Sequence, residues 1–437
     1  MSKETIRKGY WSDYPFTLTR FFPTCYFPVV KKNPPEGWKL RIVQVNEVGQ
    51  KHWEHEDVRA VGSLFLYSDE MSRFDFGPDH PFKPERAAKT YELCTRYGVM
   101  NHPWMKVLQP QTLDPELLLL FHESKYIRLL EEASQGIVRL EMLECGLGTA
   151  DNPIALGIYG WSVQGASGTH MGMQNLLNGQ AMVVFHPLGG FHHAMPDHAE
   201  GFCYINDIAI AIRSALKKSP ALRIAFVDFD AHHGNGVQEA FYEDPRVLFI
   251  SLHETGRTLY PWSGYETEVG RGEGRGFTVN FPLEPGTDDE VYGFALEAVV
   301  FPLLKSFAPD IIVAELGADT LVSDPLTHLK LTNNAYQRAV RGIMDISPKI
   351  LGLGGGGYDL YRTARCWTWA WAILNRLEPV DEFAGLVGGM MFGPEMEVGS
   401  LYDHPYQSKG EVKEKAFEEA RRVAAYIQKE IFPIHGV

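Results

Sequence analysis

Eight short apolar runs, separated by helical or loop-like sequence, constrain the fold of this chain more than any other feature. Most of them are apolar at consecutive positions, which is typical of strands buried on both faces of a parallel sheet. The runs are Ser63 to Tyr67, Lys106 to Leu108, Ala181 to Phe185, Ile224 to Phe229, Val247 to Leu252, Phe277 to Phe281, Ile311 to Leu316 and Ile350 to Leu353. The alternation therefore predicts an α/β fold with helices flanking a central eight-stranded, mainly parallel sheet.

The composition is that of a globular protein and argues against several classes. The 437 residues suffice for one large α/β domain. A net charge of −14 without a clustered basic run argues against direct contact with nucleic acid. We find no secretory signal and no long apolar stretch, so we expect a cytoplasmic protein without a membrane span. Five scattered cysteines, none in a CxxC pair, argue against a disulfide framework and a thiolate zinc site.

We expect two parts in the chain. Residues 1–60 are rich in Trp, Tyr, Phe and Pro and contain one possible strand, LRIVQV, at residues 40–45. We interpret them as an N-terminal extension of unknown role, which could cover a site or form a subunit contact. Residues 61–437 form the main domain. Its segment 413–432 has the apolar stripe of a helix that docks on the domain, through Phe417, Val423, Ala424 and Ile427.

Polar residues collect where several of the expected strands end. Asp228, Asp230 and His232 follow one strand, Ser251 and His253 follow the next, and Asp319 and the glycines of GGGGY follow two others. In open parallel sheets, ligands bind beyond the carboxyl ends of the strands. The sequence therefore predicts one site at this edge of the sheet.

The stretch DFDAH carries residues of the kind that bind metal. Alternation by two puts Asp228, Asp230 and His232 on one side of an extended chain. With Asp319 from another strand end, Asp230 and His232 give an oxygen and nitrogen ligand set of three. Such a set suits Zn²⁺ or Fe²⁺ with a position left open for water. The alternative is a buried hydrogen-bond network at a strand end.

Two further motifs carry groups for acid, base and oxyanion chemistry. His192 and His193 in GGFHHA follow a strand end and could transfer protons near neutral pH, although paired histidines are also found in structural roles. The four glycines Gly354 to Gly357 let the backbone approach a ligand and leave Tyr358 on a loop, where its hydroxyl could stabilise an oxyanion. The run does not end in GK[ST], so nucleotide binding is not expected.

Together, GFHHA…GFCYIND, DFDAHHGNGVQEAFY, GADTLVSDPL and GGGGYDLYRTARCW resemble the zinc-dependent histone deacetylase superfamily. The motifs stand in the family's order, and the match runs from about Ser63 to Leu374. The tail, which ends KEIFPIHGV, is more similar to the bacterial acetoin-utilization (AcuC-like) deacetylases than to the eukaryotic enzymes. The resemblance implies an arginase/deacetylase-like fold with its site at the carboxyl ends of the strands.

The resemblance also implies a role for each matching residue. The metal ligands are Asp230, His232 and Asp319. The catalytic group comprises His192, His193 and Tyr358, with Asp228 behind His192 and Asn235 behind His193. A structural potassium site comprises Asp228, Asp230, His232, Ser251 and Leu252. The substrate contacts are Asp151, Gly201, Phe202, Tyr260 and Leu326, and Arg86 belongs to an internal channel.

The implied activity is removal of acetyl or related acyl groups from Nε-acyl-lysine of proteins by zinc-activated water. The implied cofactors are Zn²⁺, with Fe²⁺ as the alternative, and a structural K⁺ ion. The implied partner is an acylated protein or peptide, for example a metabolic enzyme such as an acyl-CoA synthetase, and homo-oligomers remain open.

Two positions depart from patterns within the family. Asn235 stands where class I enzymes have an aspartate, so His193 should be protonated less readily, because an amide adds no negative charge. Leu326 stands where polyamine-preferring relatives have a glutamate, and an apolar gate does not favour a cationic amine.

Three alternatives are open. A binuclear ureohydrolase needs bridging carboxylates where this chain has Gly234 and Leu321, so one metal is the better interpretation. Deacetylation of a small acetylamine such as an acetylpolyamine is the second alternative. A non-catalytic scaffold that binds acyl-lysine is the third, although all the expected site residues are present.

Overall fold

The computed structural model describes residues 62–378 and 401–437 and two short strands nearer the N-terminus. The chain divides into two compact units, residues 1–39 and 40–437. The first unit, the expected domain boundary near residue 60 and most of the LRIVQV run lie outside the described residues. At the end of that run, β1 (Gln44–Val45) pairs antiparallel with β2 (Lys51–His52).

The main sheet has eight strands in the order β4-β3-β5-β10-β9-β6-β7-β8. Every neighbouring pair is parallel, so the predicted sheet is confirmed in strand number and direction. The strands are β3 (Ser63–Leu66), β4 (Met105–Leu108), β5 (Val183–His186), β6 (Ile224–Asp228), β7 (Val247–Glu254), β8 (Thr278–Leu283), β9 (Ile311–Glu315) and β10 (Ile350–Leu353). The sequence had ended β7 at Leu252, but the strand continues to Glu254, so Ser251 and His253 lie within it.

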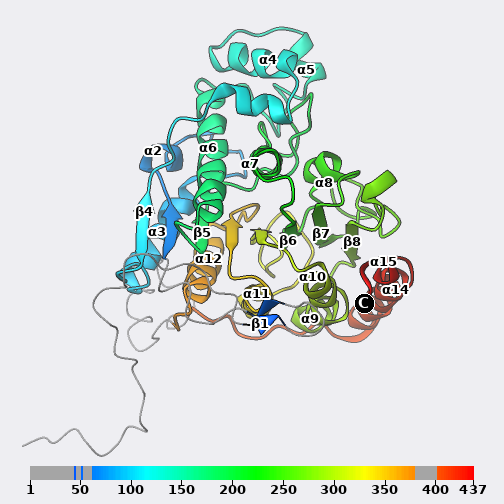
Figure 1. Cartoon of the computed structure of the whole chain (residues 1–437). Helices are drawn as coiled ribbons and strands as arrows, with labels where there is room; N and C mark the ends of the chain where they lie inside the picture. The colour runs from blue at the N-terminus through cyan, green and yellow to red at the C-terminus, as the bar shows by residue number, and fades with distance from the viewer. Residues whose placement is uncertain (1–43, 46–50, 53–61, 379–400) are drawn as a thin grey trace, which may run out of the picture. The chain divides into compact units, whose positions relative to one another are not determined.

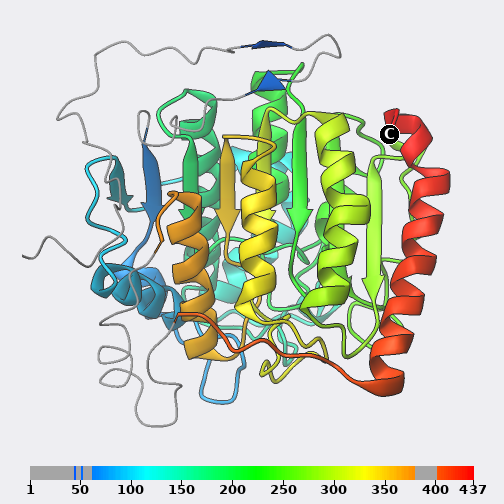
Figure 2. The ribbon, with the colours of Figure 1, turned by 90° about the horizontal axis from the view of Figure 1, so that it is seen from below.

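Helices cover both faces of this sheet, as Figures 1 and 2 show. The helices on one face and near its rim are α2 (Asp69–Ser72), α4 (Ser124–Ser134), α5 (Glu141–Glu144), α6 (Ile158–Leu177), α7 (Asp207–Lys218) and α8 (Asn235–Phe241). Those on the other face are α9 (Asp289–Ala295), α10 (Phe301–Phe307), α11 (Asn333–Met344), α12 (Leu360–Leu374), α14 (Gly410–Glu430) and α15 (Phe432–His435), together with α3 (Glu85–Arg96), which packs against α12. Short 3-10 and π turns, η1 (Pro115–Leu120), η2 (Gly272–Gly274) and η3 (Leu296–Val300), complete the connections.

The two faces bury separate hydrophobic cores, because successive side chains of a strand point to opposite sides. In β6, Ala225 and Val227 enter the core beneath α9 to α12, whereas Ile224 and Phe226 enter the core beneath α6 and α7. A strand apolar at every position is therefore what this architecture requires.

Helix α14 docks on the domain as predicted. Val423, Ala424 and Ile427 are buried against the core that includes α9, and Phe417 is partly buried beside them. Among the described residues, four cysteines are buried and free, in agreement with the sequence: Cys94, Cys145, Cys203 and Cys366. No helix in the described part of the chain is long and apolar enough to cross a membrane.

Candidate metal and catalytic site

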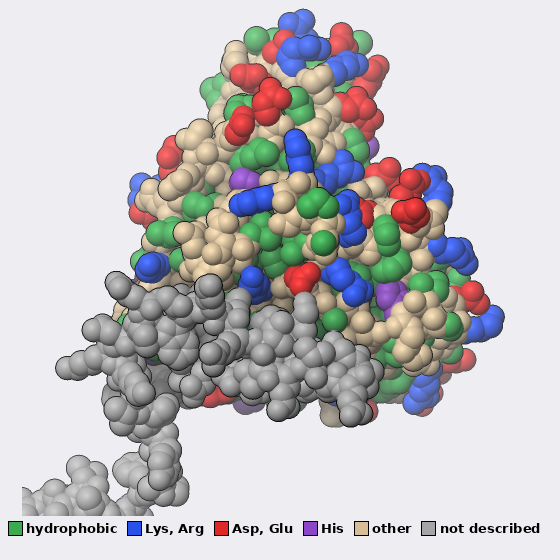
Figure 3. Space-filling model, in the orientation of Figure 1, with side chains coloured by type: hydrophobic (Ala, Val, Ile, Leu, Met, Phe, Trp, Pro, Cys, Tyr) green, Lys and Arg blue, Asp and Glu red, His purple; other side chains and the backbone are tan. Residues whose placement is uncertain are grey.

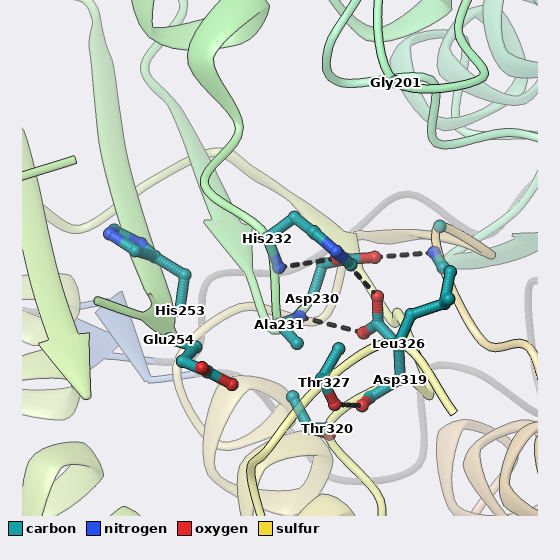
Figure 4. Close-up of polar contacts among 12 residues, drawn as sticks. Gly201, Asp230, Ala231, His232, His253, Glu254, Asp319, Thr320, Leu326 and Thr327 are labelled. Carbon is teal, nitrogen blue, oxygen red and sulfur yellow. Dashed lines mark hydrogen bonds and ion pairs between the residues drawn. The ribbon is translucent and has the colours of Figure 1, made fainter. Parts of the chain in front are cut away.

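Asp230, His232 and Asp319 come together at the carboxyl edge of the sheet, just beyond the neighbouring strands β6 and β9 (Figure 4). The Nδ1 atom of His232 lies 2.8 Å from Oδ2 of Asp319 and 3.1 Å from Oδ1 of Asp230. Each of the three offers a ligand atom, and these atoms lie within 4.8 Å of one another. The predicted set is therefore assembled in space, although Asp319 lies 87 residues after His232 in the chain.

The charges of this group show why it suits a cation. Burial would lower the pKa of His232, but its hydrogen bonds to Asp230 and Asp319 outweigh burial and raise that pKa well above its usual value. A proton on Nδ1 thus stands between the two carboxylates, where a divalent ion would satisfy both. Two carboxylates and one imidazole with a shielded, buried location fit a divalent transition metal.

The glycine loop after β10 closes one side of the group. The main-chain N–H of Gly356 donates to Oδ2 of Asp230 at 2.6 Å. A Cβ atom added at Gly356 would lie 2.2 Å from Oδ2 of Asp319 and 2.7 Å from Oδ2 of Asp230. Glycine is needed here because the backbone itself contacts the carboxylates.

The side chain of Arg86 holds this loop in place through hydrogen bonds to its main chain. Its guanidinium donates to the carbonyl oxygens of Gly357 at 2.8 Å and Gly355 at 2.5 Å. The same guanidinium lies over the rings of Phe82 and Trp367, at 4.3 Å and 5.0 Å from their centroids. Arg86 is 2 % exposed, so it acts as an internal brace for the loop that carries Tyr358.

His192 and His193 form a hydrogen-bonded pair beside this group. Their Nε2 atoms lie 3.0 Å apart. Nδ1 of His192 lies 2.9 Å from Oδ2 of Asp228, and Nδ1 of His193 lies 2.8 Å from Oδ1 of Asn235. Asp228 and Asn235 thus stand behind the two histidines as the sequence had placed them.

The environment of the pair keeps both imidazoles neutral. Burial lowers the pKa of His192 to about 4. Burial and the neighbouring imidazoles lower the pKa of His193 well below its usual value. Burial and the neighbouring Asp230 raise the pKa of Asp228. A neutral imidazole has a free nitrogen that can accept a proton, which is what a general base requires.

Aromatic rings surround His232 on the open side. The ring centroids of His193, Tyr358 and Tyr260 lie 5.9, 6.3 and 6.4 Å from that of His232. Phe202 lies 5.7 Å from Tyr358, and a Cβ atom at Gly201 would meet the Tyr260 ring at 3.0 Å. The rings of Phe202, Tyr260 and Tyr358 are partly exposed and stand beside the group of metal-binding residues.

The segment that carries Asp151 is linked to these rings through His80. The carbonyl oxygen of Asp151 is 3.1 Å from Nε2 of His80, and the His80 ring packs on Phe202 with centroids 4.9 Å apart. Asp151 is exposed beside the aromatic wall, where a substrate backbone could reach it. Leu326 lies next to Asp319 (Figure 4), and its N–H donates to Asp324.

Three of the expected potassium residues lie on adjacent strands, and Asp230 and His232 follow the end of β6. Asp228 of β6 stands opposite Ser251 of β7 in the parallel register, and Leu252 follows in β7. His253 does not join the metal group. Its ring bonds to Ser251 Oγ and to the carbonyl of Gly264, and it points away from Asp230 (Figure 4).

The space at Gly234 bears on the binuclear alternative. A Cβ atom there would lie 2.5 Å from Oδ2 of Asp228 and 3.3 Å from Nδ1 of His192. A second bridging carboxylate does not fit this position unless the His192–His193 pair moves, so the arrangement favours one metal.

The model of the histone deacetylase domain matches residues 80–374 of the chain. The chain belongs to the histone deacetylase family. It is 35 % identical over 327 residues to the acetoin utilization protein AcuC of Bacillus subtilis (strain 168), covering 73 % of this chain and 84 % of that protein. It is 35 % identical over 293 residues to histone deacetylase 8 of Xenopus tropicalis, covering 67 % and 78 %.

Solved structures agree with this family. The crystal structure of a histone deacetylase homologue from Aquifex aeolicus superimposes with a TM-score of 0.73 at 29 % identity, covering 83 % of this chain and all of that one. The predicted arginase/deacetylase-like fold is thereby confirmed. The family supports a deacetylase-type hydrolase that depends on a metal.

The prediction from the sequence missed several residues of this histone deacetylase site. Asp207 accepts from the main-chain N–H groups of Gly190 and Phe191 and so fixes the turn before the histidines. Asp324 accepts from the N–H of Tyr358 at 2.8 Å. Glu315 Oε1 lies 3.2 Å from Nδ1 of His192. Asp207 and Asp324 lie within quoted motifs, but Glu315 looked like the end of a buried strand.

Proposed function

We propose that this protein removes acetyl or related acyl groups from Nε-acyl-lysine side chains of proteins, with Zn²⁺ or Fe²⁺ bound by Asp230, His232 and Asp319. The observation that carries the proposal is the set of partly exposed rings, Phe202, Tyr260 and Tyr358, beside a buried metal-ligand set and a histidine base. We infer that an approach to the metal passes between these rings. A neutral aliphatic arm with an amide at its tip has the shape and polarity that such an approach accommodates.

The metal, when bound, supplies Lewis acidity toward a carbonyl oxygen and a water molecule. His193 takes the proton of the attacking water at Nε2 and returns it to the lysine nitrogen as the amide bond breaks. His192, held by Asp228, keeps His193 in place. His193 is neutral when it accepts the proton and carries one positive charge until it donates that proton to the leaving nitrogen.

Tyr358 stabilises the oxyanion. Burial and the charges of Asp319 and Asp230 raise the pKa of Tyr358 well above its usual value, so its hydroxyl keeps its proton and can donate. Its main chain is held by Asp324 and by the brace from Arg86 to the glycine loop. A fixed donor contributes more to the transition state than one that must reorganise.

Asp151 and Leu326 bear on the substrate class. The exposed carboxylate of Asp151 at the rim suits two backbone N–H groups of a peptide, which a small acetylamine lacks. Leu326 offers no charge to a polyamine. The proposed partner is an acylated metabolic enzyme, such as an acyl-CoA synthetase, as the resemblance to the acetoin-utilization deacetylases implies. On the face in Figure 3, basic side chains are interspersed with acidic ones.

We also propose that Asp228, Asp230, His232, Ser251 and Leu252 hold a structural K⁺ ion. Asp228 and Ser251 lie side by side at the sheet edge, and Asp228 also contacts His192. A cation there would fix the strand ends from which the metal ligands emerge.

The test is amine release from an acetyl-lysine peptide and from acetylspermidine in parallel. Chelated enzyme is reconstituted with Zn²⁺ or Fe²⁺, and Asp230→Ala serves as the control without a metal ligand. Metal-dependent turnover of the peptide alone supports the proposal. Turnover of acetylspermidine alone would replace it with a small-amine deacetylase, and turnover of neither would favour the non-catalytic alternative.

A further inference from the structure

The amide of Asn235 is held from both ends. Its Oδ1 atom lies 2.8 Å from Nδ1 of His193, and its Nδ2 atom donates to Oε2 of Glu200 at 3.2 Å. His193, Asn235 and Glu200 therefore form a continuous hydrogen-bonded chain. Glu200 belongs to the segment just before the channel residues Gly201 and Phe202 and has no role in the mechanism described so far.

We propose that Glu200 is a positioning residue for the hydrolysis: its carboxylate fixes the orientation of the Asn235 amide, and through it the tautomer of His193. The inference rests on the proposed function for its kinetic consequence, but the tautomer itself is independent of the substrate.

The orientation of an asparagine side chain is decided by its hydrogen-bond partners, because its oxygen and nitrogen are nearly equal in size. A carboxylate only accepts, so it attracts Nδ2 and repels Oδ1. If the amide of Asn235 turned over, Oδ1 would face Oε2 of Glu200, and two acceptors would oppose each other. Glu200 thus excludes the turned state.

The tautomer of His193 follows from that orientation. Oδ1 of Asn235 can only accept, so Nδ1 of His193 must carry the hydrogen. Nε2 of His193 then carries the lone pair, which accepts from Nε2 of His192 in this structure and can instead take a proton from water. In the turned state, Nδ2 of Asn235 would donate to Nδ1, the hydrogen would move to Nε2, and His193 could no longer act as a base.

An aspartate behind His193 would need no such support, because both of its oxygens accept. Asn235 by itself can adopt either amide orientation, and the neighbouring carboxylate of Glu200 selects the one with Oδ1 toward His193. Glu200 also returns to the site the negative charge that the amide lacks, one residue further from the imidazole.

The surroundings keep Glu200 charged and in place. Burial would raise the pKa of Glu200, but the neighbouring side chains of His198, Tyr260 and His193 outweigh burial and lower it. Nε2 of His198 lies 3.4 Å from Oε2 of Glu200, and the side chain of Glu200 is 26 % exposed. Its main chain is paired with Cys203 in both directions, which does not depend on the side chain. Substitutions at Glu200 should therefore leave the fold intact.

The first experiment measures kcat and KM of Glu200→Ala on an acetyl-lysine peptide. We expect kcat to fall roughly tenfold with KM within about twofold, because an unassisted amide populates both orientations and the base is present only in part. Glu200→Gln, whose Oε1 still accepts from Nδ2, should lie between wild type and Glu200→Ala. His198→Ala is the comparison variant, because it removes another partner of the same carboxylate but leaves the contact between Glu200 and the amide, so its kcat should fall clearly less than that of Glu200→Ala.

The second experiment is a double-mutant cycle with Asn235→Asp. The single variant places two carboxylates against each other and should lose activity. The double variant Glu200→Ala, Asn235→Asp removes this repulsion and provides an obligatory acceptor for Nδ1 of His193, so its kcat should recover to near wild type. An unchanged kcat in Glu200→Ala, a double variant no faster than Glu200→Ala, or an equal loss in His198→Ala would each overturn the proposal.

The third experiment reads the tautomer directly by ¹⁵N NMR of histidine-labelled, metal-free protein, with His193→Gln used to assign the signal. Wild type should show His193 protonated at Nδ1, and Glu200→Ala should show a mixture of tautomers. A wild-type enzyme that hydrolyses no acyl-lysine would refute the proposed function alone, whereas an identical tautomer in wild type and Glu200→Ala would refute the positioning role alone.

Discussion

The main-chain N–H of Gly356 lies 2.6 Å from Oδ2 of Asp230, so the glycine loop after β10 directly supports a ligand carboxylate from the end of β6. The loop and the ligand are 126 residues apart in the chain. This contact makes the backbone of the glycine loop part of the metal site.

Gly356→Ala should therefore weaken metal binding. The added Cβ would collide with the carboxylates of Asp319 and Asp230 at 2.2 and 2.7 Å, and moving either one spoils the ligand geometry. We expect metal affinity to fall at least about tenfold, measured by competition with a chromogenic chelator. Gly160→Ala in α6, where a Cβ meets nothing within 4 Å, is the control and should bind metal like wild type.

Asp230→Ala and Tyr358→Phe should separate metal binding from catalysis. Asp230→Ala removes a ligand and should abolish both bound metal and hydrolysis. Tyr358→Phe keeps the ligand set and should bind metal normally while kcat falls about 10²-fold or more, because an oxyanion donor is lost. Metal content by atomic spectroscopy and peptide turnover on the same samples provide the check. Full activity in Tyr358→Phe would refute its oxyanion role.

Arg86→Met should destabilise the protein and lower its kcat. The change leaves the carbonyls of Gly355 and Gly357 without their donor in a buried site, which costs about 2–5 kcal/mol of the free energy of unfolding. Displacement of the loop should also lower kcat through Tyr358. Urea unfolding monitored by circular dichroism measures the first effect, and Arg96→Met, on the exposed side of the same helix, should change stability little.

Glu419 on α14 should give an acid-dependent contribution to stability. Hydrogen bonds from Arg422 and Arg257 lower the pKa of Glu419 to about 2. Because the folded-state pKa lies below the unfolded one, the stabilisation is complete above the unfolded pKa of ~4.3 and is lost as the pH falls toward 2. Both arginines are about half exposed, so solvent limits the contribution to about 1 kcal/mol.

Glu419→Gln should accordingly lower the free energy of unfolding near pH 7, and its difference from wild type should shrink below about pH 4. Denaturant unfolding across this pH range is the measurement. Glu418→Gln, an exposed neighbour on the same helix, is the control. A difference that stayed constant down to pH 3 would show that the effect is not the charge of Glu419.

The sheet could be predicted from the sequence because its strands are buried on both faces and so are apolar throughout. The end of β7 could not, since His253 and Glu254 extend the strand through their pairing with Pro282 and Leu283 of β8. Such pairing depends on strand order, which a single sequence does not show.

The same limit applies to the site. Asp230, His232, Asp319 and Tyr358 stand in recognisable motifs and were predicted. Glu315 was missed, because its place beside His192 arises from the register of β9 against β6, where Glu315 lies opposite Asp228. Glu200 was missed because its partner Asn235 is 35 residues away.

Leu326→Glu should alter the choice of substrate. Leu326 is partly buried beside Asp319, and its N–H donates to Asp324, so a longer side chain at this position would extend from a fixed backbone. A glutamate there adds a negative charge, which attracts the ammonium group of a polyamine and offers nothing to a neutral acyl-lysine arm. We expect kcat/KM for acetylspermidine to rise about tenfold relative to that for an acetyl-lysine peptide, which corresponds to about 1.4 kcal/mol of preferential transition-state binding.

Leu326→Gln has the same length without the charge and should leave the ratio near that of wild type. If Leu326→Gln and Leu326→Glu changed the ratio equally, the gate would select by size, and the absence of a carboxylate would no longer argue for a protein substrate.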